Sequence, residues 1–223
     1  MSLQNVLKAQ KMSKRLAIIG ASGHGKVVAD IAQACGIKDI VFFDDRYKEL
    51  STHYGFQVAG SVQDAIELDS SSDNACFDVV IVAIGNSQIR QDIQRRFTHV
   101  SDALMHPSAI VSESVTVGSG SVLMPNVVVN ADTVIGQGCI INTGSIVEHD
   151  CRIGDFSHIC PNSALAGGVT VGNSCWIGIS SNVVQLIKIG NKVTVGAGAA
   201  VVNDIADNMT VVGVPAKRLK ERM

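Results

Sequence analysis

The stretch Val129–Val147 reads VNADTVIGQGCIINTGSIV, and it carries a six-residue period that decides the fold. The period continues without a slip from Val111 to Val201. Each repeat contributes one Val, Ile or Leu, at Val111, Val117, Leu123, Val129, Ile135, Ile141, Val147, Ile153, Ile159, Leu165, Val171, Ile177, Val183, Ile189, Val195 and Val201. A helix repeats after about 3.6 residues and a strand after about 2, so neither explains a sustained period of six.

A short fixed period indicates stacked units that cannot bury their apolar residue alone. We expect a coil of short strands around a narrow aliphatic core, with a small residue two positions before each inward one. Glycines that follow the inward residue, such as Gly136 and Gly154, are expected to permit corners. If three repeats make one turn, residues eighteen apart stack, which puts His149 between Ala131 and Gly167.

The first hundred residues predict a different domain. Short apolar runs indicate strands, and amphipathic segments between them indicate helices. The predicted strands are Arg15–Gly20, Ile40–Phe43 and Asp78–Ile84, and the predicted helices are Lys26–Cys35, 61–68 and Gln88–Phe97, the last with basic residues in its final turns. Strands that alternate with helices predict a small α/β domain with a parallel sheet.

Ligands of such sheets bind at the carboxyl ends of the strands. Three segments follow those ends here, namely Gly20–Gly25, Asp44-Asp45 and Gly85-Asn86. The glycine spacing differs from the dinucleotide fingerprint, but a glycine-rich loop that opens a helix still offers backbone N–H groups to a phosphate. The alternative is that the glycines only form a tight turn.

Composition narrows the function further. The chain has 223 residues, a net charge of −2 and 17% charged residues, which gives no electrostatic case for nucleic acid or an anionic membrane as partner. No apolar run is long enough for a membrane span. The six cysteines contain no CxxC pair, so we expect free thiols in a cytoplasmic protein and no metal site. Residues 1–14 lack a signal-peptide core and are expected to be a lead segment, in part a cloning remnant, because Met12 can serve as a start.

Both halves together resemble the hexapeptide-repeat sugar O-/N-acyltransferase family. The subgroup that fits best contains the bacterial UDP-4-amino-sugar N-acetyltransferases, which serve the UDP-N-acetylbacillosamine pathway, the GDP-perosamine N-acetyltransferases and the sialic acid O-acetyltransferase-like proteins. The matching segments are Gly20–Gly25, Phe43–Asp45, Ala83–Asn86, Asn142, Val147–Cys151, Phe156–His158, Ala166–Gly168 and Val212–Lys217.

The resemblance implies four segments. These are the lead 1–14, a Rossmann-like nucleotide-sugar-binding domain over 15–104, a left-handed parallel β-helix acetyltransferase domain over 105–210, and a C-terminal tail over 211–223. It also implies a homotrimer with acetyl-CoA in the groove between neighbouring β-helices.

Site residues follow from the same resemblance. His149 is the expected general base and Asp150 its acidic partner. The expected acetyl-CoA contacts are His158, Gly167, Asn142, Ile179, Ala197 and Lys217. The expected nucleotide-sugar contacts are Ser22, Gly23, His24, Asp44, Asp45, Gly85 and Asn86. Because adjacent residues of a strand point to opposite faces, a direct contact between His149 and Asp150 requires a corner at this point.

The leading prediction is N-acetylation of the 4-amino group of a nucleotide-activated deoxysugar, by direct transfer from acetyl-CoA, in glycan biosynthesis. The first alternative is O-acetylation of a sugar or sialic acid, since the same base serves a hydroxyl. More remote alternatives are a metal hydratase and a non-catalytic nucleotide-sugar-binding protein. The sequence leaves open whether the acceptor carries UDP or GDP.

Overall fold

The computed structural model describes residues 15–70 and 76–219, which form two compact units. The first unit holds the described residues up to Ile84 together with Arg96–Val100, and the second holds Gly85–Arg95 and the chain from Ser101 onward. The predicted lead segment 1–14 lies outside the described residues, as does the end of the predicted tail, 220–223.

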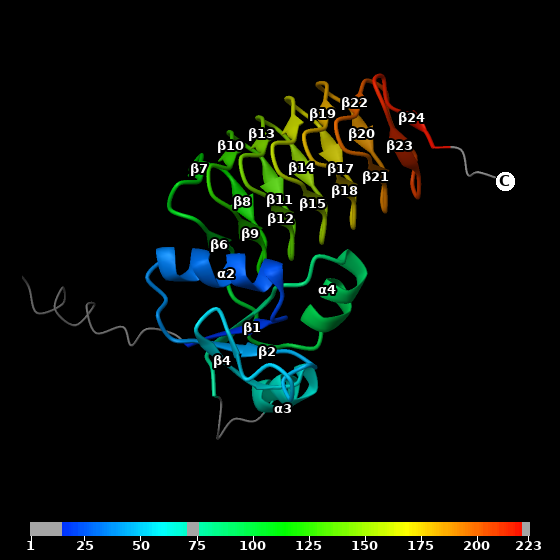
Figure 1. Cartoon of the computed structure of the whole chain (residues 1–223). Helices are drawn as coiled ribbons and strands as arrows, with labels where there is room; N and C mark the ends of the chain where they lie inside the picture. The colour runs from blue at the N-terminus through cyan, green and yellow to red at the C-terminus, as the bar shows by residue number, and fades with distance from the viewer. Residues whose placement is uncertain (1–14, 71–75, 220–223) are drawn as a thin grey trace, which may run out of the picture. The chain divides into compact units, whose positions relative to one another are not determined.

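A five-stranded sheet forms the centre of the first unit, with the strand order β3-β4-β2-β1-β5. Its strands β1, β2 and β4 are labelled in Figure 1. Its strands are β1 (Leu16–Ile19), β2 (Ile40–Phe43), β3 (Thr52–His53), β4 (Phe56–Gly60) and β5 (Val79–Val82), and its helices are α2 (Gly23–Ala34) and α3 (Val62–Ser70). β1 pairs in parallel with β2 and β5, and all three are apolar and almost wholly buried. The predicted parallel α/β sheet is therefore confirmed.

Sequence analysis missed the hairpin of β3 and β4. The chain turns between these two strands at Tyr54 and Gly55, which have φ values of 49° and 81°. Such turns usually carry Asn or Gly at both positions, so Tyr54 hides the signal. Helix α2 also begins at Gly23, three residues before the predicted start at Lys26.

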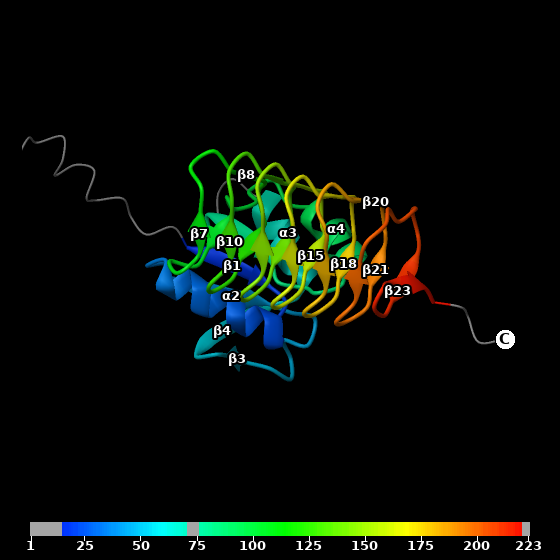
Figure 2. The same cartoon turned by 90° about the horizontal axis from the view of Figure 1, so that it is seen from above.

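The second unit is a coil of two-residue strands that stack in chain order (Figures 1 and 2). One sheet contains β7 (Ile110–Val111), β10 (Val128–Val129), β13 (Ile146–Val147), β16 (Ala164–Leu165), β19 (Asn182–Val183) and β22 (Ala200–Val201). The next contains β8 (Thr116–Val117), β11 (Val134–Ile135), β14 (Arg152–Ile153), β17 (Thr170–Val171) and β20 (Lys188–Ile189). The third contains β6 (Leu104–Met105), β9 (Val122–Leu123), β12 (Ile140–Ile141), β15 (His158–Ile159), β18 (Trp176–Ile177), β21 (Thr194–Val195), β23 (Thr210–Val212) and β24 (Lys217–Arg218).

Strand pairing confirms the predicted stack of residues eighteen apart. Ile141 pairs in parallel with Ile159, and Ile159 pairs with Ile177. The inward aliphatic residues are buried from Leu123 to Val201, and burial of each side chain contributes about 1.5–3 kcal/mol. Small polar neighbours are satisfied inside the coil, since the Ser121 hydroxyl donates to one carbonyl at 2.8 Å and accepts a backbone N–H at 2.9 Å.

The predicted reason for the glycines after the inward residues is wrong. Gly136 and Gly172 do not have a left-handed backbone; they are needed because successive coils approach closely. A Cβ atom at Gly172 would lie 2.6 Å from the carbonyl oxygen of Gly190. The left-handed corners lie two residues further along, at every sixth position from Gly120 to Gly198.

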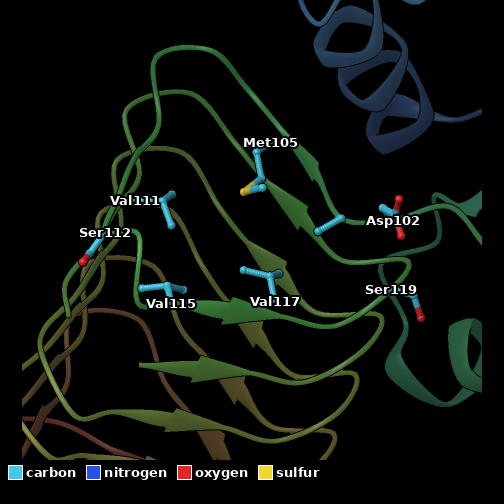
Figure 3. A pocket seen from close by; sticks show the side chains of 8 residues that line it. Asp102, Met105, Val111, Ser112, Val115, Val117 and Ser119 are labelled. Carbon is cyan, nitrogen blue, oxygen red and sulfur yellow. The ribbon is translucent and has the colours of Figure 1, made fainter. Parts of the chain in front are cut away.

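The inward residues of the first coil are less buried than those of later coils. Val111 and Val117 are half-buried and line a cavity of about 450 Å³ (Figure 3). Asp102, Ala103, Met105, Ser112, Val115 and Ser119 complete the lining.

Helix α4 (Ser87–Gln94) belongs to the coil unit, although it lies in the range 15–104 that sequence analysis assigned to the first domain. The predicted basic last turn is wrong, because the helix ends at Gln94 and Arg95 is its C-cap. Arg90 is buried and donates hydrogen bonds to the carbonyl oxygens of Gly138 at 2.8 Å and Phe156 at 2.7 Å. Burial lowers the pKa of Arg90 to about 10.

Candidate active site

His149 and Asp150 lie at the corner between the sheet of β13 and the sheet of β14. Asp150 has a φ of 60°, one of the left-handed positions of the coil. This corner brings the two neighbouring side chains together, which a continuous strand cannot do. The distance from His149 Nδ1 to Asp150 Oδ2 is 2.7 Å, and both side chains are about two-thirds exposed.

The carboxylate fixes the tautomer of the imidazole. An ionised carboxylate only accepts hydrogen bonds, so Nδ1 of His149 carries the proton and Nε2 of the neutral ring is left as an acceptor. The hydrogen bond that His149 donates to Asp150, together with the negative charges of Asp150 and Glu148, raises the pKa of His149 above its ordinary value. The imidazole of His149 is therefore a stronger base, and Nε2 is the nitrogen that accepts a proton.

Gly167 lies one coil above the imidazole, at the position that stacks on His149. A Cβ atom at Gly167 would meet His149 Cε1 and Nε2 at 2.6 Å, so only glycine leaves room for the ring. The Gly168 N–H donates to the His149 carbonyl at 2.9 Å, which locks the two coils together.

The backbone N–H of Gly167 has no acceptor among the described residues. The equivalent N–H groups at another corner of the coil are satisfied by a ladder of side chains. Gln137 N donates to Asp155 Oδ1, and Asp155 N donates to Asn173 Oδ1 at 2.8 Å. The corner of His149 therefore differs in presenting a free donor beside the proposed base.

A second cluster lies on the sheet of β15. His158 is 8% exposed, its Nε2 lies 2.9 Å from Asn142 Nδ2, and its ring meets Trp176 edge-on at 4.6 Å. The Asn142 side-chain oxygen accepts the Thr143 N–H at 2.8 Å, so the amide must turn its NH₂ group to His158. Nε2 of His158 is then the acceptor of this hydrogen bond.

The other predicted acetyl-CoA contacts lie apart from His149 in the chain. Ile179 and Ala197 stack at the corner that follows the sheet of β15, since the Gly198 N–H donates to the Ile179 carbonyl at 2.8 Å. Neither Ile179 N nor Ala197 N has an acceptor in the part of the chain that the structure describes. Lys217 is exposed in β24. One chain thus brings His149, Asp150 and Gly167 together, and places Asn142, His158, Ile179 and Ala197 on a different side of the coil.

The glycine loop of the first unit is tightly built. A Cβ atom at Gly25 would lie 2.0 Å from the Gly20 carbonyl oxygen, and Gly20 has a φ of 106°. Ser22 and Gly23 are exposed at the start of α2, and His24 is half-buried in its first turn. Ser22 is the N-cap but its side chain makes no capping hydrogen bond.

Asp44 is tied to this loop. Its carboxylate accepts the Ala21 N–H at 2.8 Å and the guanidinium of Arg46 at 3.0 Å. Burial alone would raise the pKa of Asp44, but the hydrogen bonds from Arg46 and Ala21 outweigh it and hold the pKa below its ordinary value. Arg46 also donates to the Ala21 carbonyl at 2.9 Å. Sequence analysis did not identify Arg46 as part of this loop's structure.

Three other predicted sugar contacts have structural partners. Asp45 accepts the Val62 N–H at 3.1 Å at the start of α3. Asn86 is the N-cap of α4 and accepts the Ile89 N–H at 3.0 Å. The Gly85 carbonyl accepts a hydrogen bond from Arg90 at 2.9 Å. Their roles toward a nucleotide sugar stay predictions.

His53 makes a further contact with the glycine loop that sequence analysis did not identify. Its Nε2 lies 3.0 Å from the Ser22 carbonyl oxygen, and its ring packs edge-on against Phe42. Tyr54 extends the same link by donating to Asp30 at 3.0 Å. The hairpin of β3 and β4 is therefore fastened to the start of α2.

No metal-binding group of three or more His, Cys, Asp or Glu side chains occurs in residues 15–70 and 76–219. None of the described cysteines forms a disulfide. Each helix within the described ranges is too short or too polar to cross a membrane.

Comparison with known proteins gives two family matches. Residues 15–97 match the PglD N-terminal domain, and residues 132–167 match the bacterial transferase hexapeptide (six repeats). The acetyltransferase domain of PglB from Neisseria gonorrhoeae FA1090 is 43% identical, with a TM-score of 0.85 over 92% of this chain and 100% of that domain. The chain belongs to the PglD-like family of hexapeptide-repeat acetyltransferases. The resemblance inferred from the sequence is confirmed.

Other members of the PglD-like family carry ligands or a curated name. A mutant of perosamine N-acetyltransferase from Caulobacter crescentus, in complex with CoA and GDP-perosamine, is 36% identical, with a TM-score of 0.85 over 93% of this chain and 97% of that one. The PglB domain is also known in complex with acetyl coenzyme A. The UDP-N-acetylbacillosamine N-acetyltransferase of Bacillus subtilis (strain 168) is 36% identical over 113 residues, which are 49% of this chain and 50% of that protein. The chain thus aligns with about half the length of this curated relative.

Proposed function

We propose that this protein transfers the acetyl group of acetyl-CoA to the 4-amino group of a nucleotide-activated deoxysugar. The observation that carries the proposal is the His149–Asp150 pair at 2.7 Å, with a free Nε2 and the Gly167 N–H at one corner of the coil. The relatives support the two substrates, since one binds acetyl-CoA and another binds CoA and GDP-perosamine.

The reaction proceeds by direct transfer. The sugar amine attacks the thioester carbonyl, a C–N bond forms, and the amine proton moves to Nε2 of His149. The N–H of Gly167 donates to the oxyanion that develops on the carbonyl. The C–S bond then breaks, and the departing CoA sulfur takes the proton from the imidazolium. General-base catalysis of this kind contributes about 10²–10⁴ in rate.

Charge around His149 favours an amine as acceptor. Asp150 and Glu148 lie beside the ring, and Asp132 is one coil below Asp150. A protonated amine is attracted to this acidic side before it passes its proton to the base. The nucleotide part is assigned to the glycine loop of the first unit, where the exposed N–H groups at the start of α2 suit phosphate.

We also infer a homotrimer. In one chain the base lies on a different side of the coil from Asn142, His158, Ile179 and Ala197, so these predicted donor contacts reach His149 only from a second copy. The outer face of the sheet of β7 and β13 is apolar, with Ile110 68% and Ile146 40% exposed.

A substrate panel tests the proposal. CoA release is measured with acetyl-CoA and either UDP- or GDP-linked 4-amino sugars, and the matched 4-hydroxy sugars and sialic acid serve as controls. We expect turnover with a 4-amino sugar and none with its hydroxyl analogue. Turnover with hydroxyl acceptors alone would make the protein an O-acetyltransferase, and no turnover with any acceptor would contradict both enzymatic functions.

A further inference from the structure

Leu186 is an unusual residue for its place in the coil. It occupies one of the left-handed corner positions, with a φ of 64°, and its side chain is 74% exposed. Most of these positions hold Gly, Asn, Asp or Ser, which adopt such a backbone readily. Phe156 is another bulky exception, but it is buried beneath α4. Packing within the chain therefore accounts for Phe156 and not for an exposed leucine.

Leu186 lies directly beside the proposed catalytic corner. Its N–H donates to the Gly167 carbonyl at 3.0 Å, and its Cδ2 would be 2.8 Å from a Cβ atom at Gly168. The imidazole of His149 covers Gly167 from the coil below. The Gly167-Gly168 pair thus forms a strip with the base at one end and Leu186 at the other.

The two sides of His149 differ in polarity. On the side of the earlier coils lie Asp132 and Glu148, with Asn130 bound to Glu148 at 2.8 Å. On the side of the later coils, three aliphatic side chains are exposed, Val184 at 39%, Leu186 at 74% and Val202 at 42%, beside the polar Gln185 and Asn203. An acceptor sugar, which carries hydroxyls and an amine, suits the acidic side. The alkyl end of an acyl thioester suits the exposed aliphatic side chains.

We propose that Leu186 contacts the acyl group of the donor and sets its chain length, an assignment that rests on the proposed acyl transfer. The side chain closes the strip above Gly168, so a short acyl group fits between it and His149. A smaller or polar residue at this position loses the contact with acetyl and admits a longer chain.

Leu186→Asn separates function from stability, because asparagine tolerates the left-handed backbone better than leucine. We expect the melting temperature to rise by about 2–4 °C. The ratio of kcat/KM for acetyl-CoA to that for butyryl-CoA is expected to fall about tenfold, as removal of a hydrophobic contact allows. The KM for the nucleotide sugar stays unchanged, because Leu186 lies on the opposite side of the base.

Lys192→Asn is the matched control. Lys192 is also exposed at a left-handed corner, with a φ of 54°, but it stacks with Ser174 and not at the corner that carries Asp150 and Leu186. The substitution relieves the same backbone conformation, so the melting temperature rises as in Leu186→Asn. The acyl-chain ratio is expected to stay at the wild-type value.

An unchanged acyl-chain ratio in Leu186→Asn would overturn the proposal. A selective rise of the KM for the nucleotide sugar would also overturn it, because Leu186 would then contact the acceptor. A change of mass in light scattering with an unchanged ratio of kcat/KM for the two donors would overturn it as well, because Leu186 would then be a subunit contact. Calorimetry with acetyl-CoA and butyryl-CoA gives the corresponding ratio of affinities without turnover. A wild type that binds both donors but transfers neither would contradict the proposed function, while the binding ratio still decides the role of Leu186.

Discussion

At the residue scale, the contact between His149 and Asp150 depends on a single backbone angle. The sequence suggested the pair and required a corner, but the period alone did not say where the left-handed residues fall. Aspartate is among the residues that tolerate this backbone, and at position 150 it serves both the turn and the base. Arg46 and His53 were missed because each contacts a backbone carbonyl of the glycine loop, at Ala21 and Ser22, which no sequence pattern marks.

Asp150→Asn tests the electrostatic part of the site. Asp150 raises the pKa of His149, and the base acts only when the imidazole is neutral, so wild-type activity is lost as the pH falls through this raised pKa. The substitution removes the charge and shifts the acidic limb of the kcat/KM profile to lower pH. It also lowers the plateau by about 10-fold or more, because the base is weaker and its tautomer is no longer fixed. An acidic limb at the wild-type pH would show that another group controls the profile.

At the element scale, the period predicted the coil because each inward aliphatic residue meets its equivalent eighteen residues away. The hairpin of β3 and β4 was not predictable in the same way, since its strands are short, largely exposed and joined by Tyr54-Gly55. Helix α4 was located to within a few residues, but its attachment to the coil was not foreseen. An arginine on a short helix normally predicts a solvated face, whereas Arg90 is 1% exposed.

Arg90→Met should destabilise the coil unit. The substitution keeps an apolar stem but leaves the carbonyl oxygens of Gly138 and Phe156 without their donor, which costs about 1–3 kcal/mol for each buried group. Urea unfolding of the full chain measures the change. Arg95→Met is the control, because Arg95 is exposed at the end of the same helix and its removal should leave the midpoint unchanged within error.

At the scale of the whole molecule, the sequence predicted two different halves because their patterns differ, an alternation of strands and helices before a strict period of six. Composition does not locate the boundary between the two units, because the chain crosses it more than once. Gly85–Arg95 belongs to the coil unit, whereas Arg96–Val100 belongs to the sheet domain. The incomplete set of donor contacts around His149 in one chain leads to the proposed trimer.

Light scattering tests the assembly. We expect three times the chain mass of 23.4 kDa for the wild type. Ile146→Lys puts a charge on the outer face of β13 and is expected to lower the mass and the turnover together, since the donor contacts come from a second copy. A wild-type mass of one chain would contradict the shared site.

In the proposed mechanism, His149 accepts the proton of a nucleotide-sugar amine as acetyl is transferred to that amine. Single-turnover acetylation by the wild type and by His149→Ala tests this role, with the amide product quantified by mass spectrometry and acetyl-CoA affinity measured in parallel. We expect a rate about 10² or more lower in the variant, with acetyl-CoA affinity nearly unchanged. A variant that forms the amide at close to the wild-type rate would contradict it.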